Sequence, residues 1–225
     1  MLMTAEEQLL AIKKNNENTL DVMGALAEGR SLKSLRHIKR VKAFTGILSE
    51  RVRDMFPEYG VDNQMVMIIA NASSLHDIGK IAIPESILFK PGRLTKEEFE
   101  VMQTHTLEGC NILENIDNAW DDLYKKTVYE ICRSHHEKYN GKGYPDALVG
   151  DDIPIAAQIV SVADVYDALV CERVYAEAFT KEQAYHMIQA GECGEFNPKI
   201  LDCLREARIG YEKVADLSRE KEAQG

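Results

Sequence analysis

Histidine and aspartate side chains recur along this sequence at a regular spacing. Five of the six histidines and two aspartates form sites about 30 to 40 residues apart, the length of one helix and its connection. These residues are His37, His76, Asp77, His105, His135, His136 and Asp164. Imidazole and carboxylate groups without thiolates suit iron, manganese, zinc or nickel. The spacing is typical of a metal site that facing helices build inside a bundle.

The adjacent pair His135 and His136 stands directly before a glycine-rich turn. Side chains at neighbouring helix positions point about 100° apart and cannot share one apolar face, which favours a site between helices. Seven ligands are too many for one ion, whereas two ions that share an aspartate and a water can use them all. Asp77, next to His76, is the predicted bridge. Two such ions lower the pKa of the bridging water and hold the attacked and leaving oxygens of a phosphoryl group.

Helical periodicity predicts the elements that must position these residues. The expected helices span residues 4–29, 33–56, 62–77, 95–116, 121–137, 155–171, 180–190 and 197–215. Residues 140–154 hold three glycines and two prolines, which favours a loop or short hairpin there. No strand-rich region and no internal repeat interrupts the pattern. The sequence therefore predicts an all-α helical bundle with one loop or hairpin and an N-terminal amphipathic helix.

Three regions are expected along the chain. Residues 1–29 form the N-terminal helix, residues 30–215 the domain with the histidines, and residues 216–225 a tail that frays. In the first region, five apolar residues stand near heptad spacing: Leu9, Ile12, Leu20, Met23 and Leu26. Two interpretations stay open for this helix. It packs on its own domain, or it is a connector that dimerises or relays a signal.

Composition and charge narrow the classes of function. The chain has 225 residues, of which 45% are hydrophobic and 28% charged, as expected for a globular domain. The net charge of −10 argues against binding a nucleic acid polymer. No apolar run reaches the roughly 18–20 residues of a membrane span, and the N-terminus does not resemble a secretory signal. The five cysteines are scattered without a CxxC pair, which argues against a disulfide framework and indicates the cytoplasm.

Three further features have ordinary interpretations. His186 lies outside every motif and is expected on a helix surface. Asp167, one turn after Asp164, either orients a ligand histidine or makes a hydrogen bond elsewhere, and both interpretations stay open. The basic run at residues 30–42 is expected to be a solvated helix face rather than a nucleic-acid patch.

Four stretches, in this order, carry a resemblance to a known family. They are SLHDIGK, THT, HHEKYNGKGYP and IVSVADVYDAL. Together they resemble the HD-GYP family of HD-domain phosphohydrolases, over about residues 28–205. The resemblance implies metal-dependent hydrolysis of a cyclic dinucleotide, mainly cyclic di-GMP, in bacterial signal transduction.

The resemblance also assigns roles to individual residues. The seven histidines and aspartates named above match metal-ligand positions, and Asp77 with Lys80 makes up the expected catalytic pair. Lys80 matches a residue near the scissile phosphate, and Arg173 matches a contact to a substrate phosphate. The expected signature loop consists of Gly141, Gly143, Tyr144 and Pro145. The implied cofactors are two divalent transition-metal ions, iron or manganese first, with zinc or nickel as alternatives.

Two departures from the family pattern shape the expectations. Some members hold a third metal with a glutamate four residues before the first histidine, but this chain has Lys33 there, so two ions are expected. The family often has Arg-Pro-Tyr and a basic residue where this chain has Arg173-Val174-Tyr175-Ala176. The alternatives are therefore a binding module without turnover, or a hydrolase that acts on another nucleotide. The expected partners are the cyclic dinucleotide, a second copy through the N-terminal helix, and an upstream sensor or receiver domain.

Overall fold

The computed structural model describes residues 4–29, 31–115, 120–171 and 178–223. Within these ranges the chain is built from α-helices and short 3-10 helices, and one isolated antiparallel bridge joins Asn140 and Val149. The predicted all-α class is therefore confirmed. None of the described helices combines the length and the hydropathy that a membrane crossing requires.

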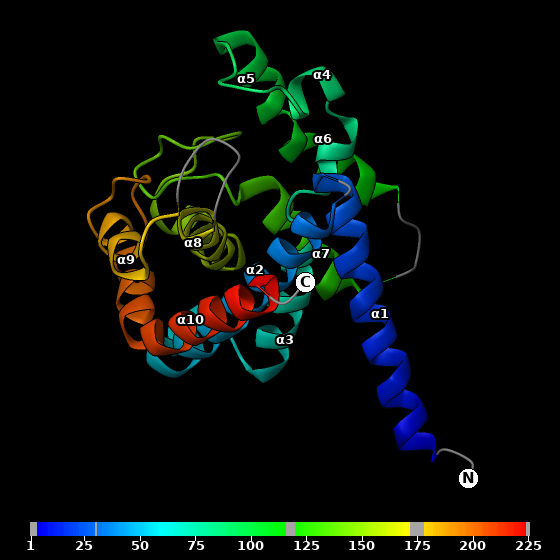
Figure 1. Cartoon of the computed structure of the whole chain (residues 1–225). Coiled ribbons are helices and arrows are strands. Elements are labelled where there is room, and N and C mark those ends of the chain that lie inside the picture. The colour runs from blue at the N-terminus through cyan, green and yellow to red at the C-terminus, as the bar shows by residue number, and fades with distance from the viewer. Residues whose placement is uncertain (1–3, 30, 116–119, 172–177, 224–225) are drawn as a thin grey trace.

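Figure 1 shows the order and arrangement of the helices. The α-helices are α1 (Ala5–Glu28), α2 (Leu32–Met55), α3 (Asn63–Ala72), α4 (Glu85–Leu88), α5 (Lys96–Gln103), α6 (His105–Glu114), α7 (Asp122–Ser134), α8 (Ile155–Val170), α9 (Lys181–Gln189) and α10 (Pro198–Ala223). The 3-10 helices are η1 (Pro57–Tyr59), η2 (Ser73–Leu75), η3 (Ile78–Ala82) and η4 (Gly150–Asp152). Threonine side chains begin three of the α-helices with a capping box, at Thr4, Thr95 and Thr180.

Helix α2 forms the centre of the bundle and packs against α1, α3, α8 and α10. Its apolar face follows the predicted periodicity, and Val41, Phe44 and Leu48 are fully buried. The Phe44 ring stacks on Tyr211 of α10 at 4.6 Å and meets the edge of Tyr166 of α8 at 5.1 Å. These contacts fix the positions of α2 and α8, which both carry predicted metal ligands.

Four predicted helices have other bounds in the structure. The helix predicted at 95–116 is divided at Thr104 into α5 and α6, and the helix predicted at 121–137 ends at Ser134, so His135 and His136 lie just beyond it. The apolar run at 62–77 does not form one helix, because α3 ends at Ala72 and the chain tightens into η2 and then η3. His76 and Asp77 therefore lie in the turn between the two 3-10 helices, where neighbouring side chains can face the same site. At the other end of the chain, α10 continues to Ala223, past the predicted end at residue 215. The three predicted domain regions stay predictions.

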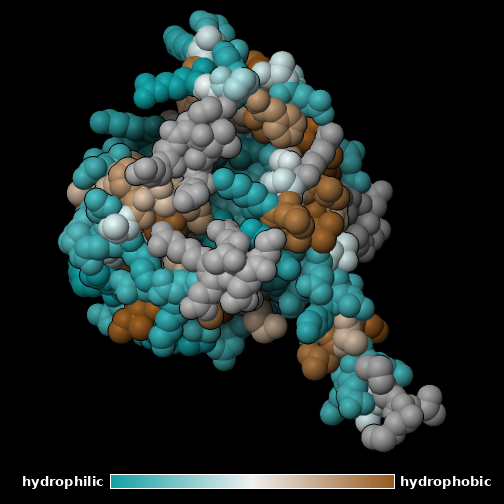
Figure 2. All heavy atoms as spheres, viewed as in Figure 1, coloured by the Kyte–Doolittle hydropathy of each residue, from teal (hydrophilic) through white to brown (hydrophobic). Residues whose placement is uncertain are grey.

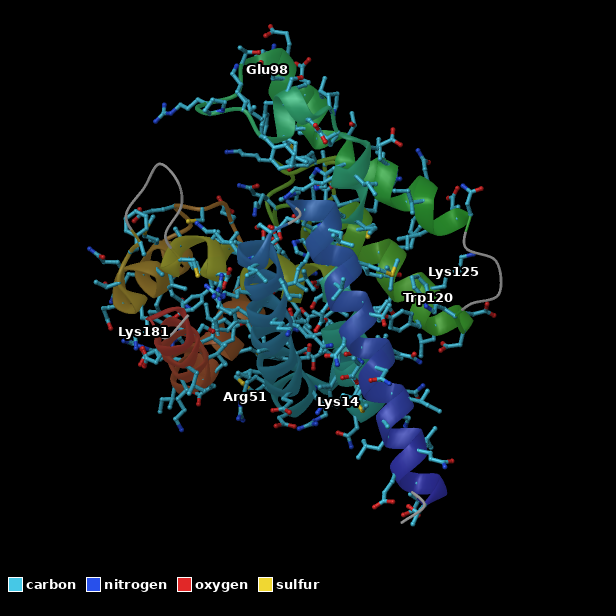
Figure 3. The ribbon with its side chains drawn as sticks, turned by 45° about the vertical axis from the view of Figure 1, so that its right-hand side comes forward. Lys14, Arg51, Glu98, Trp120, Lys125 and Lys181 are labelled. Atoms are coloured by element: carbon cyan, nitrogen blue, oxygen red, sulfur yellow. The ribbon has the colours of Figure 1, made fainter. Side chains whose placement is uncertain are left out.

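The face by which α1 packs is the main correction to the sequence analysis. The heptad residues Leu9, Ile12, Met23 and Leu26 are exposed, and only Leu20 of that set packs partly against the core. The residues that α1 buries are instead small or polar: Asp21, Gly24, Ala25 and Ala27. Small side chains let the helix approach the backbone of η2 closely. Figures 1 and 3 show the later turns of α1 beside α2, while its first turns extend past the body.

Candidate metal centre

The structure brings the seven predicted ligand residues together from five separate segments. Two groups form, and within each group the ligand atoms lie within 4.8 Å of one another. The first group is Asp77, His105, His135 and His136, and the second is His37, His76 and Asp164. Imidazole and carboxylate atoms at this spacing could hold one ion per group.

The imidazole rings of His76, His105 and His135 are held by the same kind of hydrogen bond. Each ring places Nδ1 2.7 to 2.9 Å from a backbone carbonyl oxygen three or four residues earlier in the chain. A carbonyl oxygen can only accept, so Nδ1–H donates, and in its neutral form each ring carries its lone pair on Nε2. All three Nε2 atoms are buried and have no hydrogen-bond partner among the described residues. A metal site requires buried ring nitrogens without a partner, on imidazoles whose other nitrogen is fixed by a hydrogen bond.

Asp77 faces both groups with its two oxygens. Its Oδ1 lies 3.2 Å from His105 Nε2 and 3.6 Å from His135 Nε2. Its Oδ2 lies 3.2 Å from His76 Nε2 and also pairs with Lys80 Nζ. Ligand atoms bound to one ion at about 2.1 Å stand roughly 3.0 to 3.5 Å apart, so these separations fit shared ions. A carboxylate in this position could bridge the two groups.

The charges around Asp77 keep it ionised. Burial alone would raise the pKa of this carboxyl, but the positive charges of Lys80 and His76 outweigh it and hold the pKa well below its usual range. Burial alone would lower the pKa of Lys80, but the carboxylates of Asp77 and Glu28 outweigh it and raise the pKa. The result is an anion and a cation side by side at neutral pH.

Of the two roles expected for Asp167, orienting a ligand histidine or making a hydrogen bond elsewhere, the structure shows the first, because its carboxylate binds His37. Its Oδ2 lies 2.6 Å from His37 Nδ1, and its Oδ1 accepts a hydrogen bond from Arg40 Nε at 2.5 Å. His37 Nε2 then points at Asp164 Oδ1, 3.5 Å away. Arg40 is 5% exposed, so the interpretation of the basic run as a solvated face is wrong at this residue. His186, by contrast, is exposed on α9 as expected and pairs with Glu182 at 2.7 Å.

Glu28, at the end of α1, also reaches this centre. Its Oε1 lies 3.5 Å from His37 Nε2, and its Oε2 is buried without a hydrogen-bond partner among the described residues. Burial raises the pKa of its carboxyl. Glu28 stands outside every motif that carries the resemblance, so no sequence signal pointed to it.

The loop of residues 140–154 is anchored by Glu137, which is 3% exposed. The Glu137 carboxylate accepts hydrogen bonds from the backbone N–H groups of Asp146 at 2.7 Å and Leu148 at 3.1 Å. A side chain at Gly143 would meet the Glu137 backbone, since a Cβ there would lie 2.3 Å from Glu137 Cα. Gly141 has a φ of +76°, in the region that favours glycine. The predicted loop is therefore held tightly against the end of α7.

A cavity of about 500 Å³ opens above the two groups. Its lining includes Lys80, His136, Tyr144 and Lys33. The Tyr144 ring stacks on His136 at 4.8 Å, which places an aromatic face beside the first group. Pro145 follows Tyr144 in the loop and is not among the lining residues. Arg173, the predicted phosphate contact, lies outside the described residues, but α8 ends at Val170, where the sequence analysis expects this helix to end.

Comparisons with known proteins agree with this geometry. The family model described as "HD domain" matches residues 6–200. The chain is 36% identical to the cyclic di-GMP phosphodiesterase response regulator RpfG of Xanthomonas campestris, over 94% of this chain and 54% of that protein. It is also 36% identical to the 3'3'-cGAMP-specific phosphodiesterase 2 of Vibrio cholerae, over 88% of this chain and 36% of that protein. The chain thus spans about half or less of these relatives.

A solved structure extends the comparison to the fold. The cyclic GMP-AMP specific phosphodiesterase V-cGAP3 of Vibrio cholerae superposes with a TM-score of 0.58 at 16% identity. The superposition covers 91% of this chain and 52% of that chain. At this identity the likeness shows a shared fold.

Proposed function

Because this chain belongs to the HD-domain family and carries the HD-GYP signature, we propose that it is a metal-dependent phosphodiesterase that hydrolyses a cyclic dinucleotide, cyclic di-GMP first. The observation that carries the proposal is the set of buried, unpartnered Nε2 atoms of His76, His105 and His135 around the Asp77 carboxylate. Relatives at 36% identity are named as phosphodiesterases of cyclic di-GMP and of 3'3'-cGAMP. The fold and the polar cavity support the same class of substrate.

The proposed cofactors are two divalent ions, iron or manganese first and zinc or nickel as alternatives. Asp77 with His105, His135 and His136 would hold one ion, and His37, His76 and Asp164 would hold the other, with Asp77 shared. Such ions would supply Lewis-acid activation of a water and of a phosphoryl oxygen. The chain's own donor atoms fit them, since oxygen and imidazole ligands without sulfur suit these metals.

The remaining roles belong to side chains around the cavity. Lys80 brings a positive charge beside Asp77, where it would stabilise negative charge that develops on the phosphate. Tyr144 offers an aromatic face on which a base can stack. Arg173 is proposed to contact a phosphate with its two-pronged guanidinium. The cavity volume of about 500 Å³ falls in the range of roughly 300 to 1,000 Å³ that small-molecule ligands occupy.

The test is a substrate screen with a matched inactive variant. Purified chain with Mn²⁺ or Fe²⁺ is incubated with cyclic di-GMP, 3'3'-cGAMP and cyclic di-AMP, and the products are separated by chromatography. The expected result is linear dinucleotide from cyclic di-GMP, lost in Asp77→Asn. The Arg173→Ala variant should raise KM while its metal content stays unchanged. Turnover retained in Asp77→Asn would place the chemistry elsewhere.

Two alternatives are separated by the same screen. Preferential hydrolysis of 3'3'-cGAMP would reassign the substrate, as the second relative suggests. Binding of a cyclic dinucleotide without turnover, with both ions bound, would instead support a binding module, in line with the altered segment Arg173-Val174-Tyr175-Ala176.

The proposal extends to partners and location. The exposed apolar residues Leu9, Ile12, Met23 and Leu26 support a homodimer through α1, and an upstream sensor or receiver domain is proposed before it. Figure 2 shows hydrophobic residues gathered along α1 on an otherwise mostly hydrophilic face. All five cysteines are free, which fits the reducing cytoplasm. Light scattering of the purified chain, and of a Leu9→Glu/Ile12→Glu variant, tests the dimer.

A further inference from the structure

We propose that Glu28 is a ligand of the ion that His37, His76 and Asp164 would hold, supplied by α1 from outside the predicted 30–215 domain. The inference rests on the proposed dimetal centre and adds one carboxylate to it. It makes the last turn of α1 a part of the metal site.

The geometry around His37 carries the proposal. Glu28 Oε1 and Asp164 Oδ1 each lie 3.5 Å from His37 Nε2. Ligand atoms of one ion stand roughly 3.0 to 3.5 Å apart, so both carboxylates are at ligand spacing from the same imidazole nitrogen. The other oxygen, Glu28 Oε2, is buried and has no hydrogen-bond partner among the described residues. A buried carboxylate oxygen without a donor is costly unless a cation approaches it.

The position of Glu28 is fixed because the preceding turns of α1 are docked on the segment that leads to His76. Asp21 is 5% exposed and accepts hydrogen bonds from Ser74 Oγ at 2.8 Å and Lys42 Nζ at 3.3 Å. One turn later, Gly24 lies so close to η2 that a Cβ on it would stand 1.9 Å from the Ser74 carbonyl oxygen. The end of α1 is thus held by contacts to Ser74, which stands two residues before the proposed ligand His76.

Adding Glu28 to the group of His37, His76 and Asp164 gives this group one more negative charge and one more ligand. Without Glu28, the second group has one carboxylate of its own and shares Asp77 with the first group. With Glu28, it has two histidines and two carboxylates in addition to the shared one. Oxygen-rich sets of this kind suit manganese and iron. A second anion also offsets more of the charge of a divalent ion in a partly buried site.

The experiment measures Mn²⁺ binding to the metal-stripped full chain, by equilibrium dialysis with elemental analysis and by the Mn²⁺-dependent rise in melting temperature. Glu28→Gln removes the charge, and Glu28→Asp keeps the charge but withdraws the carboxylate by one carbon–carbon bond, about 1.5 Å. Glu6→Gln is the matched control, because Glu6 is exposed in the first turn of the same helix.

The wild type is expected to bind two Mn²⁺ ions. In Glu28→Gln and in Glu28→Asp the weaker ion should bind at least about tenfold less tightly, the range seen when groups around metal sites are removed, while the tighter ion is unchanged. Glu6→Gln should behave as the wild type. Circular dichroism of the metal-free proteins checks that each variant is folded.

Each other outcome has a defined meaning. Wild-type Mn²⁺ affinity in Glu28→Gln would overturn the inference and leave the proposed phosphodiesterase intact. Wild-type affinity in Glu28→Asp with a loss in Glu28→Gln would also overturn it, because charge alone would then explain the effect. No Mn²⁺ binding and no hydrolysis by the wild type would instead defeat the proposed function itself.

Discussion

Replacing Gly24 by alanine tests whether α1 packs against η2, directly before His76 and Asp77, as closely as described. Alanine at a helix interior normally stabilises a protein by about 1 kcal/mol relative to glycine. At Gly24 the added Cβ would lie 1.9 Å from the Ser74 carbonyl oxygen and 3.3 Å from Ile38 Cδ1. The two effects have opposite signs, so the sign of the measured change is informative.

The magnitude follows from how far α1 has to move. To bring the Cβ to a tolerable distance from the Ser74 oxygen, the helix must shift by more than about 1 Å, and overpacking of this kind costs about 1–3 kcal/mol. Such a shift also stretches the hydrogen bond of 2.8 Å from Ser74 Oγ to Asp21. A hydrogen bond to a charged group contributes about 1.5–3 kcal/mol. After subtracting the helix-propensity gain, Gly24→Ala should lower the free energy of unfolding by about 1.5–5 kcal/mol.

The assay is urea unfolding of the metal-free protein at constant m-value, with Gly46→Ala in α2 as control. A Cβ at Gly46 would have its nearest neighbour, Ala70 Cβ, at 3.7 Å, so this variant should gain about 0.5–1 kcal/mol. The Gly24→Ala variant should also bind the weaker Mn²⁺ ion less tightly, because Glu28 moves with α1. The reasoning is refuted if Gly24→Ala is as stable as Gly46→Ala.

Three further predictions concern the groups around the candidate metal centre. Asp167→Ala should lower the free energy of unfolding by about 3–5 kcal/mol, because it removes the buried hydrogen bonds that the Asp167 carboxylate accepts from His37 and Arg40, each contributing about 1.5–3 kcal/mol. Urea unfolding measures this loss, and a value below about 1 kcal/mol would contradict the prediction. The wild-type contribution of Asp167 is present above its ordinary pKa of 3.8, and is lost as pH falls through its lowered folded pKa. Without metal, burial lowers the pKa of His76 but the Asp77 carboxylate outweighs it and raises the pKa to about 9. The stability that the His76–Asp77 pair contributes is therefore full below pH 6.5 and is lost as pH rises through about 9. Mn²⁺ affinity should rise from pH 6.5 to 8.5, because the proton leaves His76 over this range. An affinity that does not depend on pH would contradict this prediction. Glu137→Ala should free the 140–154 loop and reduce hydrolysis about 10- to 100-fold with unchanged metal content, measured by kinetics and elemental analysis, and unaltered turnover would refute it.

Much of the fold was predictable, because helices are specified by local periodicity. Val41, Phe44 and Leu48 recur on one face of α2, and that face is the buried one. Helix ends were harder: the apolar run after Asn63 gave no sign that the chain tightens into 3-10 turns before His76. Those turns form through packing against α1 and α6, and such distant contacts leave no local pattern.

That the seven candidate ligand residues come together was also predictable, because they recur at a spacing that matches one helix and its connection. The identity of the side chains around these residues was not predictable. The residue four positions before His37 is Lys33, and the carboxylate of Glu28, on another helix, reaches His37 instead. Arg40 looked like part of a solvated basic face and is buried against Asp167 instead.

The sequence by itself determined the residue types of the candidate metal centre, the all-α class and the family to which the chain belongs. These features depend on composition, periodicity and short motifs, all of which are local properties of the sequence. Only the tertiary structure decided which face of α1 is buried and which carboxylates approach the histidines. Burying Asp21 and Glu28 is favourable only where Ser74 and His37 stand opposite them, and that pairing is created when distant segments pack together.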